Sequence, residues 1–384
     1  MRLRKLEFAA VLAGFALLWL VLIVSIARPA DMRALNRAAE PRPGLSPLAF
    51  ADAEYRSRWT GWFTDKLVLA GAARRANRVI ETRVFADAAS GRVIAGEDGW
   101  LFLNRDNPSV SLLPGGGGGR DARTLDGVAA ALARLDAAGI DARFALAPHK
   151  PSIYPDRLPA PVRETQAAEA ARRTALMAQL KQAHGAQMVD VFAAMAARAR
   201  EAELYLPRDT HWSDRGAAVM ARALVNAFKP DLWDEDAVRP GGFEDYVPDL
   251  ERLQGSTAPR RKPVLEVNRS AVRVTPLPAP EGAPFWWSRI TADGPDGALL
   301  GPITLVGDSY AQGLMKFLAP YFSETRFVHI DALETPEAAD LLSGAEHVAV
   351  VIVERHLLAP APHGPAGLGA RLDAALGGEG GGAQ

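Results

Sequence analysis

The sequence contains no cysteine, which excludes disulfides, thiolate zinc sites and cysteine nucleophiles. It also lacks an excess of charge of either sign, since 44 lysines and arginines stand against 45 aspartates and glutamates. Neither a basic surface for nucleic acid nor an acidic solvating tail is therefore indicated. What is present is a chain of 384 residues that is 48% hydrophobic, which is enough for one large core or two smaller ones.

One long uncharged run stands near the N-terminus. Residues 8–27 (FAAVLAGFALLWLVLIVSIA) carry no charge, and as a helix they would span about 30 Å, the thickness of the hydrocarbon core. A cleaved secretory signal has a shorter apolar region and a small-residue cleavage site, whereas this run ends at Arg28-Pro29. We therefore expect residues 1–30 to be an uncleaved anchor, with the N-terminus in the cytoplasm and the rest exported.

The composition divides the remaining chain into three parts. Residues 31–50 are rich in proline and arginine and predict a juxtamembrane linker, and residues 51–358 predict one exported domain. Within that domain, residues 231–298 contain many prolines and glycines and predict an irregular insertion. Residues 359–384 predict a mostly flexible tail with one short helix at 369–376.

Helical and extended patterns alternate along the exported domain. Apolar residues at helical spacing predict a helix over 124–138, and the strand IDARFALAPHK (140–150) follows it. The segments PITLVGDS (302–309) and HVAVVIVERHL (347–357) are further strands with continuous apolar runs. This alternation predicts an α/β fold with a parallel sheet and helices on both faces.

Two other patterns do not predict a binding site. The run PGGGGGR (114–120) lacks the Gly-Lys-Ser/Thr that a phosphate loop requires, so we expect a flexible loop. Six of the seven histidines lack the paired spacing with carboxylates that a metal site would show, and we expect no metal and no cofactor. These six are His149, His184, His329, His347, His356 and His363.

Ser309 is the candidate nucleophile. In LVGDSY it follows a predicted strand at a tight turn where a helix begins, which exposes the hydroxyl and the first helical amides. A serine needs a base within hydrogen-bond reach, and His211 in PRDTHWSDRG is the candidate. Asp209, on the same loop, can accept the other imidazole N–H and fix the tautomer. The alternative is that Asp209 and His211 only hold their loop.

Three further residues are candidates for contact with a substrate. Lys150 and Tyr154 follow one predicted strand end, and Arg355 follows the last strand. The carboxyl ends of the strands are where open α/β sheets bind ligands. For Lys150 and Tyr154 the alternative is a solvated loop, and for Arg355 it is a structural role. Asp308 is expected to shape the turn before the serine.

The two catalytic motifs together resemble a known family. A GDS at a strand end is similar to SGNH hydrolases, and a preceding DTHWS is similar to the alginate O-acetyltransferase family of the AlgJ and AlgX type. Further segments resemble that family in the same order along the chain. They are GEDGWLFL (96–103), APHKPSIYPDRLP (147–159), PDLERLQG (248–255) and VVIVERHL (350–357).

The resemblance implies a three-layer α/β/α SGNH hydrolase-like domain, anchored to the inner membrane by a single span and facing the periplasm. It implies O-acetylation of an exopolysaccharide through an acetyl-serine, with Ser309, His211 and Asp209 as the triad. The implied partners are a polysaccharide acceptor and a membrane-bound O-acyltransferase that supplies acetyl groups; no nucleic acid is implied. We expect no appended carbohydrate-binding module, because the chain ends in a glycine-rich tail.

Two alternatives to this function are open. A carbohydrate acetyl esterase of the SGNH type would use the same triad, and the sequence does not separate transfer from hydrolysis. A non-catalytic polysaccharide-binding or scaffold subunit is the second alternative, although all three triad residues are retained. The polymer, which need not be alginate, and the acetylated hydroxyl are not indicated by the residues.

Overall fold

The structure is a computed structural model that describes residues 93–104, 119–359 and 362–377, together with Gly44, Tyr55, Arg56, Trp59 and Thr60. The predicted anchor lies outside these residues. Within the described ranges, every helix is too short or too polar to span a bilayer.

The chain divides into two compact units, which we describe separately. One unit comprises residues 1–93 and 247–258, and its described part includes helix α9 (Asp249–Leu253), which follows Pro248. The other unit comprises residues 94–246 and 259–384 and contains the main sheet.

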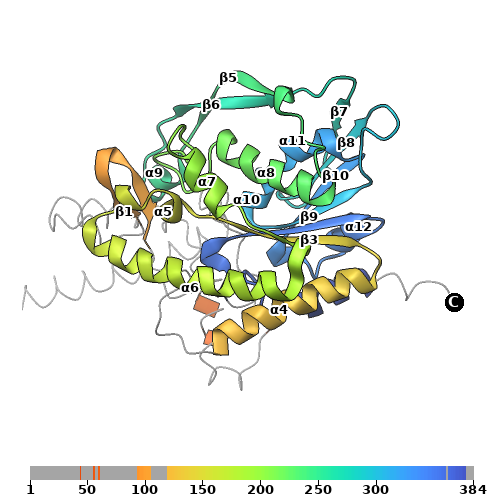
Figure 1. The fold of residues 1–384 in the computed structure, drawn as a ribbon, viewed down its shortest axis with the longest axis horizontal. Coiled ribbons are helices and arrows are strands. Elements are labelled where there is room, and N and C mark those ends of the chain that lie inside the picture. The colour runs from red at the N-terminus through yellow and green to blue at the C-terminus, as the bar shows by residue number, and fades with distance from the viewer. Residues whose placement is uncertain are drawn as a thin grey trace, which may run out of the picture. The chain divides into compact units, whose positions relative to one another are not determined.

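A seven-stranded sheet forms the centre of the larger unit, with the strand order β4-β3-β11-β9-β10-β8-β7 (Figure 1). The first five strands in this order are parallel to one another. They are β4 (Met188–Val189), β3 (Asp141–Ala147), β11 (His347–Val353), β9 (Ile303–Gly307) and β10 (Glu324–His329). Strands β8 (Ser288–Asp293) and β7 (Arg273–Pro276) join antiparallel. The predicted parallel sheet is therefore a mixed sheet.

The central strands β9 and β11 are mostly apolar. Residues of β9 and β11 are nearly all buried, as a sheet covered on both faces requires. Val350 of β11 is paired with Phe144 of β3 on one side and with Val306 of β9 on the other. The continuous apolar runs thus place these segments in the middle of the sheet.

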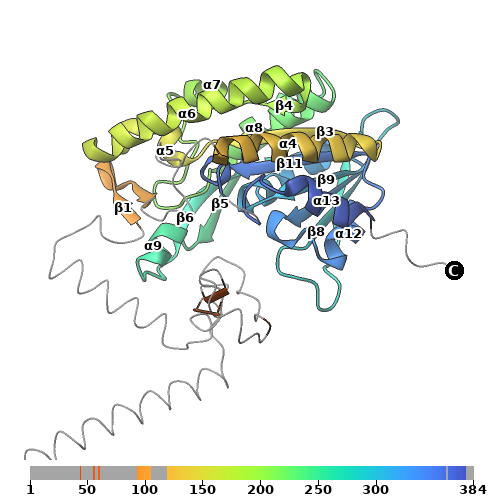
Figure 2. The same cartoon turned by 90° about the horizontal axis from the view of Figure 1, so that it is seen from below.

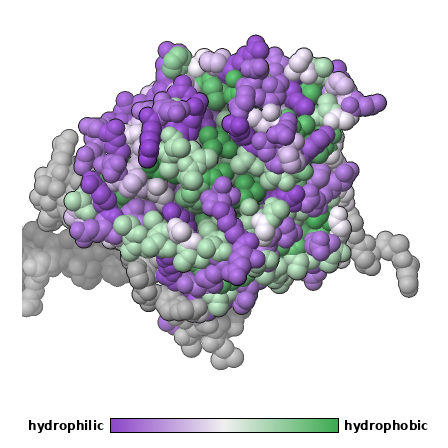
Figure 3. All heavy atoms as spheres, in the orientation of Figure 1, coloured by the Kyte–Doolittle hydropathy of each residue, from purple (hydrophilic) through white to green (hydrophobic). Residues whose placement is uncertain are grey.

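Helices cover both faces of the sheet (Figure 2). Those on one face are α4 (Gly119–Ala137), α12 (Pro336–Leu342) and α13 (Leu368–Gly377). Those on the other are α8 (Asp214–Phe228) and α11 (Met315–Leu318). Helix α6 (Ala160–His184) contacts α4 and the edge strand β4. On the face shown in Figure 3, apolar residues gather in the middle and polar residues cover most of the margin.

Short elements lie at the carboxyl ends of the strands. Strands β1 (Val93–Ala95) and β2 (Leu101–Leu103) form a two-stranded sheet. The short helices are α5 (Lys150–Ile153), α7 (Phe192–Arg198) and α10 (Ser309–Gln312). Helix α5 follows β3, and α10 follows β9.

Part of the segment 231–298 is regular, which corrects the predicted irregular insertion. Strands β5 (Val238–Tyr246) and β6 (Arg260–Val267) pair as an antiparallel ribbon, and β7 and β8 extend the main sheet. The ribbon is exposed along most of its length, so it lacks the alternation of apolar and polar residues that marks a half-buried strand. A register shift between Pro240 and Phe243 interrupts the pattern further.

The predicted flexible tail is also corrected for its described part. Helix α13 confirms the short helix predicted at 369–376, and it packs on α4. At Gly369, an added Cβ would lie 2.6 Å from the Cβ of Ala130, so the glycine allows the two helices to approach closely. The small residues that make this contact possible are the same ones that make the segment resemble a flexible linker.

Candidate active site

The turn after β9 presents Ser309. Asp308 is the N-cap of α10, and its Oδ1 accepts a hydrogen bond from the backbone N of Tyr310 at 2.9 Å. Gly307 is required because a Cβ there would lie 2.0 Å from the carbonyl oxygen of Val351 in β11. The strand therefore turns sharply beside β11 and places Ser309 at the first position of the helix.

The second carboxylate oxygen of Asp308 joins this turn to the end of β11. Oδ2 accepts hydrogen bonds from the backbone N of Val353 at 2.9 Å and from Nδ1 of His356 at 3.1 Å. Burial acts to raise the pKa of Asp308, but the His356 hydrogen bond and the nearby Arg355 charge lower this pKa to about 2. Asp308 is thus an ionised structural carboxylate, in agreement with the expectation that it shapes the turn.

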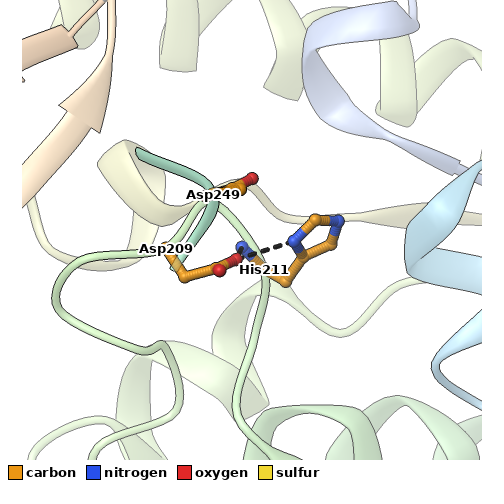
Figure 4. Close-up of side chains that lie close together, drawn as sticks. All are labelled: Asp209, His211 and Asp249. Carbon is orange, nitrogen blue, oxygen red and sulfur yellow. Dashed lines mark hydrogen bonds and ion pairs between the residues drawn. The ribbon is translucent and has the colours of Figure 1, made fainter. Parts of the chain in front are cut away.

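The three predicted catalytic residues lie in one hydrogen-bonded series. His211 Nε2 is 2.9 Å from Ser309 Oγ. His211 Nδ1 is 2.7 Å from Asp209 Oδ1, the contact that the dashed line in Figure 4 marks. The same Asp209 oxygen accepts the backbone N of His211 at 2.9 Å. Asp209 therefore favours the tautomer with hydrogen on Nδ1, which leaves the Nε2 lone pair facing the serine hydroxyl.

Aromatic side chains join the loop of the base to the helix of the nucleophile. The Tyr310 hydroxyl donates a hydrogen bond to the carbonyl oxygen of Thr210. The Tyr310 ring lies with its centroid 5.2 Å from that of His211 and 5.0 Å from that of Trp212. The residue after the serine thus contacts Thr210 and the two residues that follow it, which fixes the two loops relative to each other.

Lys150 lies beneath the loop that carries the base. Its side chain is buried, with an exposed fraction of 2%, and its ammonium donates to three backbone carbonyls. These belong to Leu206 at 3.1 Å, Pro207 at 3.1 Å and Asp209 at 2.6 Å. The structure therefore shows Lys150 engaged with the loop, in place of the solvated setting considered from sequence. Its contact with a substrate stays a prediction.

Tyr154 has a similar place. Its hydroxyl accepts the backbone N of Leu204 at 2.8 Å and lies 3.4 Å from the carbonyl oxygen of Ala202. The Tyr205 hydroxyl donates in the opposite direction, to the carbonyl of Pro148. The segment after β3 thus holds the loop before His211 at several points, and a contact between Tyr154 and substrate is likewise still a prediction.

Arg355 lies beside the triad. Its guanidinium carbon is 5.3 Å from the centroid of the Tyr310 ring, and the side chain lines a small pocket. The pocket lining consists of Leu103, His149, Lys150, Pro151, Thr210, Tyr310 and Arg355. Thr210 precedes His211 and Tyr310 follows Ser309, so the pocket that these two residues line is adjacent to the reacting atoms. Ser309 and His211 themselves are not part of the lining. The contact of Arg355 with a substrate stays a prediction.

Sequence reasoning missed a buried ion pair behind this pocket. Glu354 is fully buried and accepts hydrogen bonds from Arg173 Nη1 at 2.7 Å and from the backbone N of His149 at 3.2 Å. It joins the end of β11 to the end of β3. The signal available in the sequence was the run Glu-Arg-His directly after an apolar strand. The histidine of this run, His356, is also the residue that contacts Asp308.

Residues 93–325 match the family model described as an SGNH hydrolase-like domain, acetyltransferase AlgX. Among solved structures, the chain is similar to the O-acetyltransferase domain of Pseudomonas putida AlgJ, with 19% identity, a TM-score of 0.46 and coverage of 70% of this chain and 92% of that chain. It is also similar to Pseudomonas aeruginosa AlgX, with 14% identity, a TM-score of 0.45 and coverage of 73% of this chain and 66% of that chain. A third similar structure is Bacillus cereus PatB1 with a sulfonyl adduct, with 12% identity, a TM-score of 0.48 and coverage of 71% of this chain and 97% of that chain. No curated protein matches the chain.

Proposed function

Because this chain belongs to the AlgX acetyltransferase family of SGNH hydrolase-like domains, we propose that it transfers acetyl groups to hydroxyls of an exopolysaccharide. The observation that carries this proposal is the series Asp209–His211–Ser309, with distances of 2.7 Å and 2.9 Å between its members. A base within hydrogen-bond reach of a serine, itself oriented by a carboxylate, is the arrangement that acyl transfer through serine requires.

In the first step, Ser309 Oγ attacks the carbonyl carbon of an acetyl donor while His211 Nε2 takes the hydroxyl proton. The tetrahedral intermediate then collapses, the bond to the donor breaks, and the leaving group takes the proton from His211. The product is acetyl-Ser309. Asp209 supports the imidazolium that exists between these two proton transfers.

In the second step, a sugar hydroxyl replaces the donor. His211 Nε2 takes the proton of this hydroxyl as its oxygen attacks the acetyl carbon, and the proton then passes to Ser309 Oγ as the serine ester bond breaks. Of the backbone amides at the start of α10, that of Tyr310 is held by Asp308, so we assign the amide of Ser309 to the acetyl oxygen. One such donor commonly contributes about 3 kcal/mol to transition-state stabilisation. We assign Arg355, at the adjacent pocket, to contact with the acceptor.

We further propose that residues 1–30 anchor the protein in the inner membrane with the catalytic domain in the periplasm. The uncharged run of residues 8–27 supports this location. A periplasmic enzyme has no direct access to cytoplasmic acetyl donors. A membrane-bound O-acyltransferase that passes acetyl groups across the membrane is therefore the proposed supplier.

The proposal is tested with the full chain in detergent and 4-nitrophenyl acetate as the acetyl donor. We expect mass spectrometry to show one added acetyl group on Ser309, and an acceptor oligosaccharide to remove it with formation of an acetylated sugar. Ser309→Ala should show neither product, whereas Ser288→Ala, on strand β8, should behave as the wild type. Acetate release that the acceptor neither speeds nor diverts would instead establish an esterase.

A further inference from the structure

Lys150 directs three hydrogen bonds to one loop. An ammonium has three N–H donors, and the three acceptors here are the carbonyls of Leu206, Pro207 and Asp209. The shortest of these bonds, at 2.6 Å, is the one to Asp209. Lys150 is the first residue of α5, directly after the β3 strand end, so the rigid sheet fixes the position from which it reaches the loop.

The surroundings of this ammonium make it costly to bury. Its nitrogen lies 5.4 Å from the centroid of the Trp100 ring and 5.1 Å from that of Phe102, and the side chain is almost fully buried. A buried charge is tolerated only when dipoles and ring faces replace its water. An apolar side chain would fill this space without that penalty but would leave three carbonyls without a donor. The cation therefore has a function that packing alone does not explain.

We propose that Lys150 is a positioning residue, which acts through Asp209 to orient the His211 imidazole; this rests on the acyl transfer proposed above. The Asp209 carbonyl is held by Lys150, and its Oδ1 holds both the backbone N and the Nδ1 of His211. A rotation of Asp209 thus turns the ring away from Ser309. Misplacing a reacting group by about 1 Å commonly costs about 100-fold in rate.

Tyr154 provides the matched comparison. Its hydroxyl holds the same loop at Leu204, and the described hydrogen bonds of that hydroxyl do not include Asp209. Tyr154→Phe loosens the loop without changing the group that fixes the aspartate. Lys262, which lies 5.5 Å from the Tyr246 ring centroid on the exposed ribbon, provides a control for the removal of a lysine charge.

The experiment compares full-length Lys150→Met, Lys150→Arg, Tyr154→Phe and Lys262→Met. The rate constant and the half-saturating concentration for acetylation of Ser309 by 4-nitrophenyl acetate are measured, together with the melting temperature. The low-field imidazole Nδ1–H resonance in the proton NMR spectrum reports the bond between His211 and Asp209. For Lys150→Met we expect the rate constant to fall by about 100-fold, the half-saturating concentration to change by less than about 2-fold, and the resonance to disappear.

The other variants separate positioning from loop stability. Lys150→Arg keeps the charge and should restore about 10-fold of the lost rate. Tyr154→Phe should lower the melting temperature yet keep the resonance and lose less of the rate than Lys150→Met, and Lys262→Met should resemble the wild type. Rate losses that follow the melting temperatures of all variants equally would overturn the proposal, as would a folded Lys150→Met with full rate and an intact resonance.

The experiment also tests the proposal if Lys150→Met does not fold or if wild-type Ser309 is not acetylated. If Lys150→Met does not fold, Lys150→Arg carries the test: a slower rate at an unchanged melting temperature supports positioning, and a wild-type rate with a wild-type resonance refutes it. If wild-type Ser309 is not acetylated at all, the acyl-transfer function fails. The dependence of the resonance on Lys150 then still decides whether this residue orients the Asp209–His211 pair.

Discussion

Replacing Asp209 by asparagine isolates the charge of the triad from its geometry. Asp209 Oδ1 accepts two hydrogen bonds from His211, at 2.9 Å from the backbone N and at 2.7 Å from Nδ1. An asparagine whose carbonyl oxygen occupies this position keeps both bonds and the same tautomer. What it removes is the negative charge beside an imidazole that becomes positive during each proton transfer.

The magnitude follows from Coulomb's law. Two unit charges about 4 Å apart interact by about 4 kcal/mol at an effective dielectric constant of about 20. Losing that interaction in the transition state lowers the rate constant by about 10³-fold. Asp209→Ala removes both hydrogen bonds as well, and the partly buried amide of His211 then lacks a partner, which costs about 1–3 kcal/mol of folding free energy.

The assay therefore measures acetylation of Ser309 and urea unfolding for Asp209→Asn and Asp209→Ala together. We expect the asparagine variant to be as stable as the wild type and slower by about 10³-fold, and the alanine variant to be both slow and less stable. A stable asparagine variant with wild-type rate would show that the carboxylate charge has no catalytic part. Asp209 and His211 would then only hold their loop.

Four other expectations follow from the same geometry. Ser309→Ala and His211→Ala should each abolish acetyl transfer in a folded protein, and the double variant should lose far less than the sum, because the triad acts as a unit. Gly307→Ala forces a Cβ to 2.0 Å from a carbonyl of β11, so its melting temperature and its acetylation rate should both fall. The pKa of Asp308 is lowered to about 2 by its histidine partner, so its contribution of about 2 kcal/mol is present above pH 4 and is lost as the pH falls toward 2. Urea unfolding of Asp308→Asn should lack this part of the acid dependence. Peptide sequencing of the mature protein should recover residues 8–27 in the membrane fraction, and a mature N-terminus near residue 31 would refute the anchor.

The geometry of the candidate site could be predicted from the sequence because its motifs are local. Asp209 and His211 are two residues apart on one loop, and Ser309 directly follows an apolar strand, so each motif indicates its own geometry. Placing both at strand ends of one sheet brought them together without knowledge of any contact. The order of the central strands was not indicated in the same way, since strand order depends on pairing between distant segments.

The ribbon of β5 and β6 was misassigned because it is exposed and does not show the periodic burial on which sequence prediction depends. Lys150 was equally hard to predict, because a lysine after a strand end is ordinarily exposed. Its burial depends on the loop of residues 204–209, which covers it and supplies carbonyl acceptors. No pattern in the sequence indicates that this loop lies next to Lys150.

The place of β11 has a consequence for synthesis. This strand is the last of the sheet to be synthesised, yet it lies between β3 and β9. Strand β3 leads to Lys150, which holds the loop of His211, and β9 leads to Ser309. A nascent chain that ends before residue 347 therefore has both halves of the triad but no strand to join them. We therefore expect a chain truncated before residue 347 to lack the assembled triad and to be inactive in acetyl transfer, so that insertion of the final strand completes the candidate site.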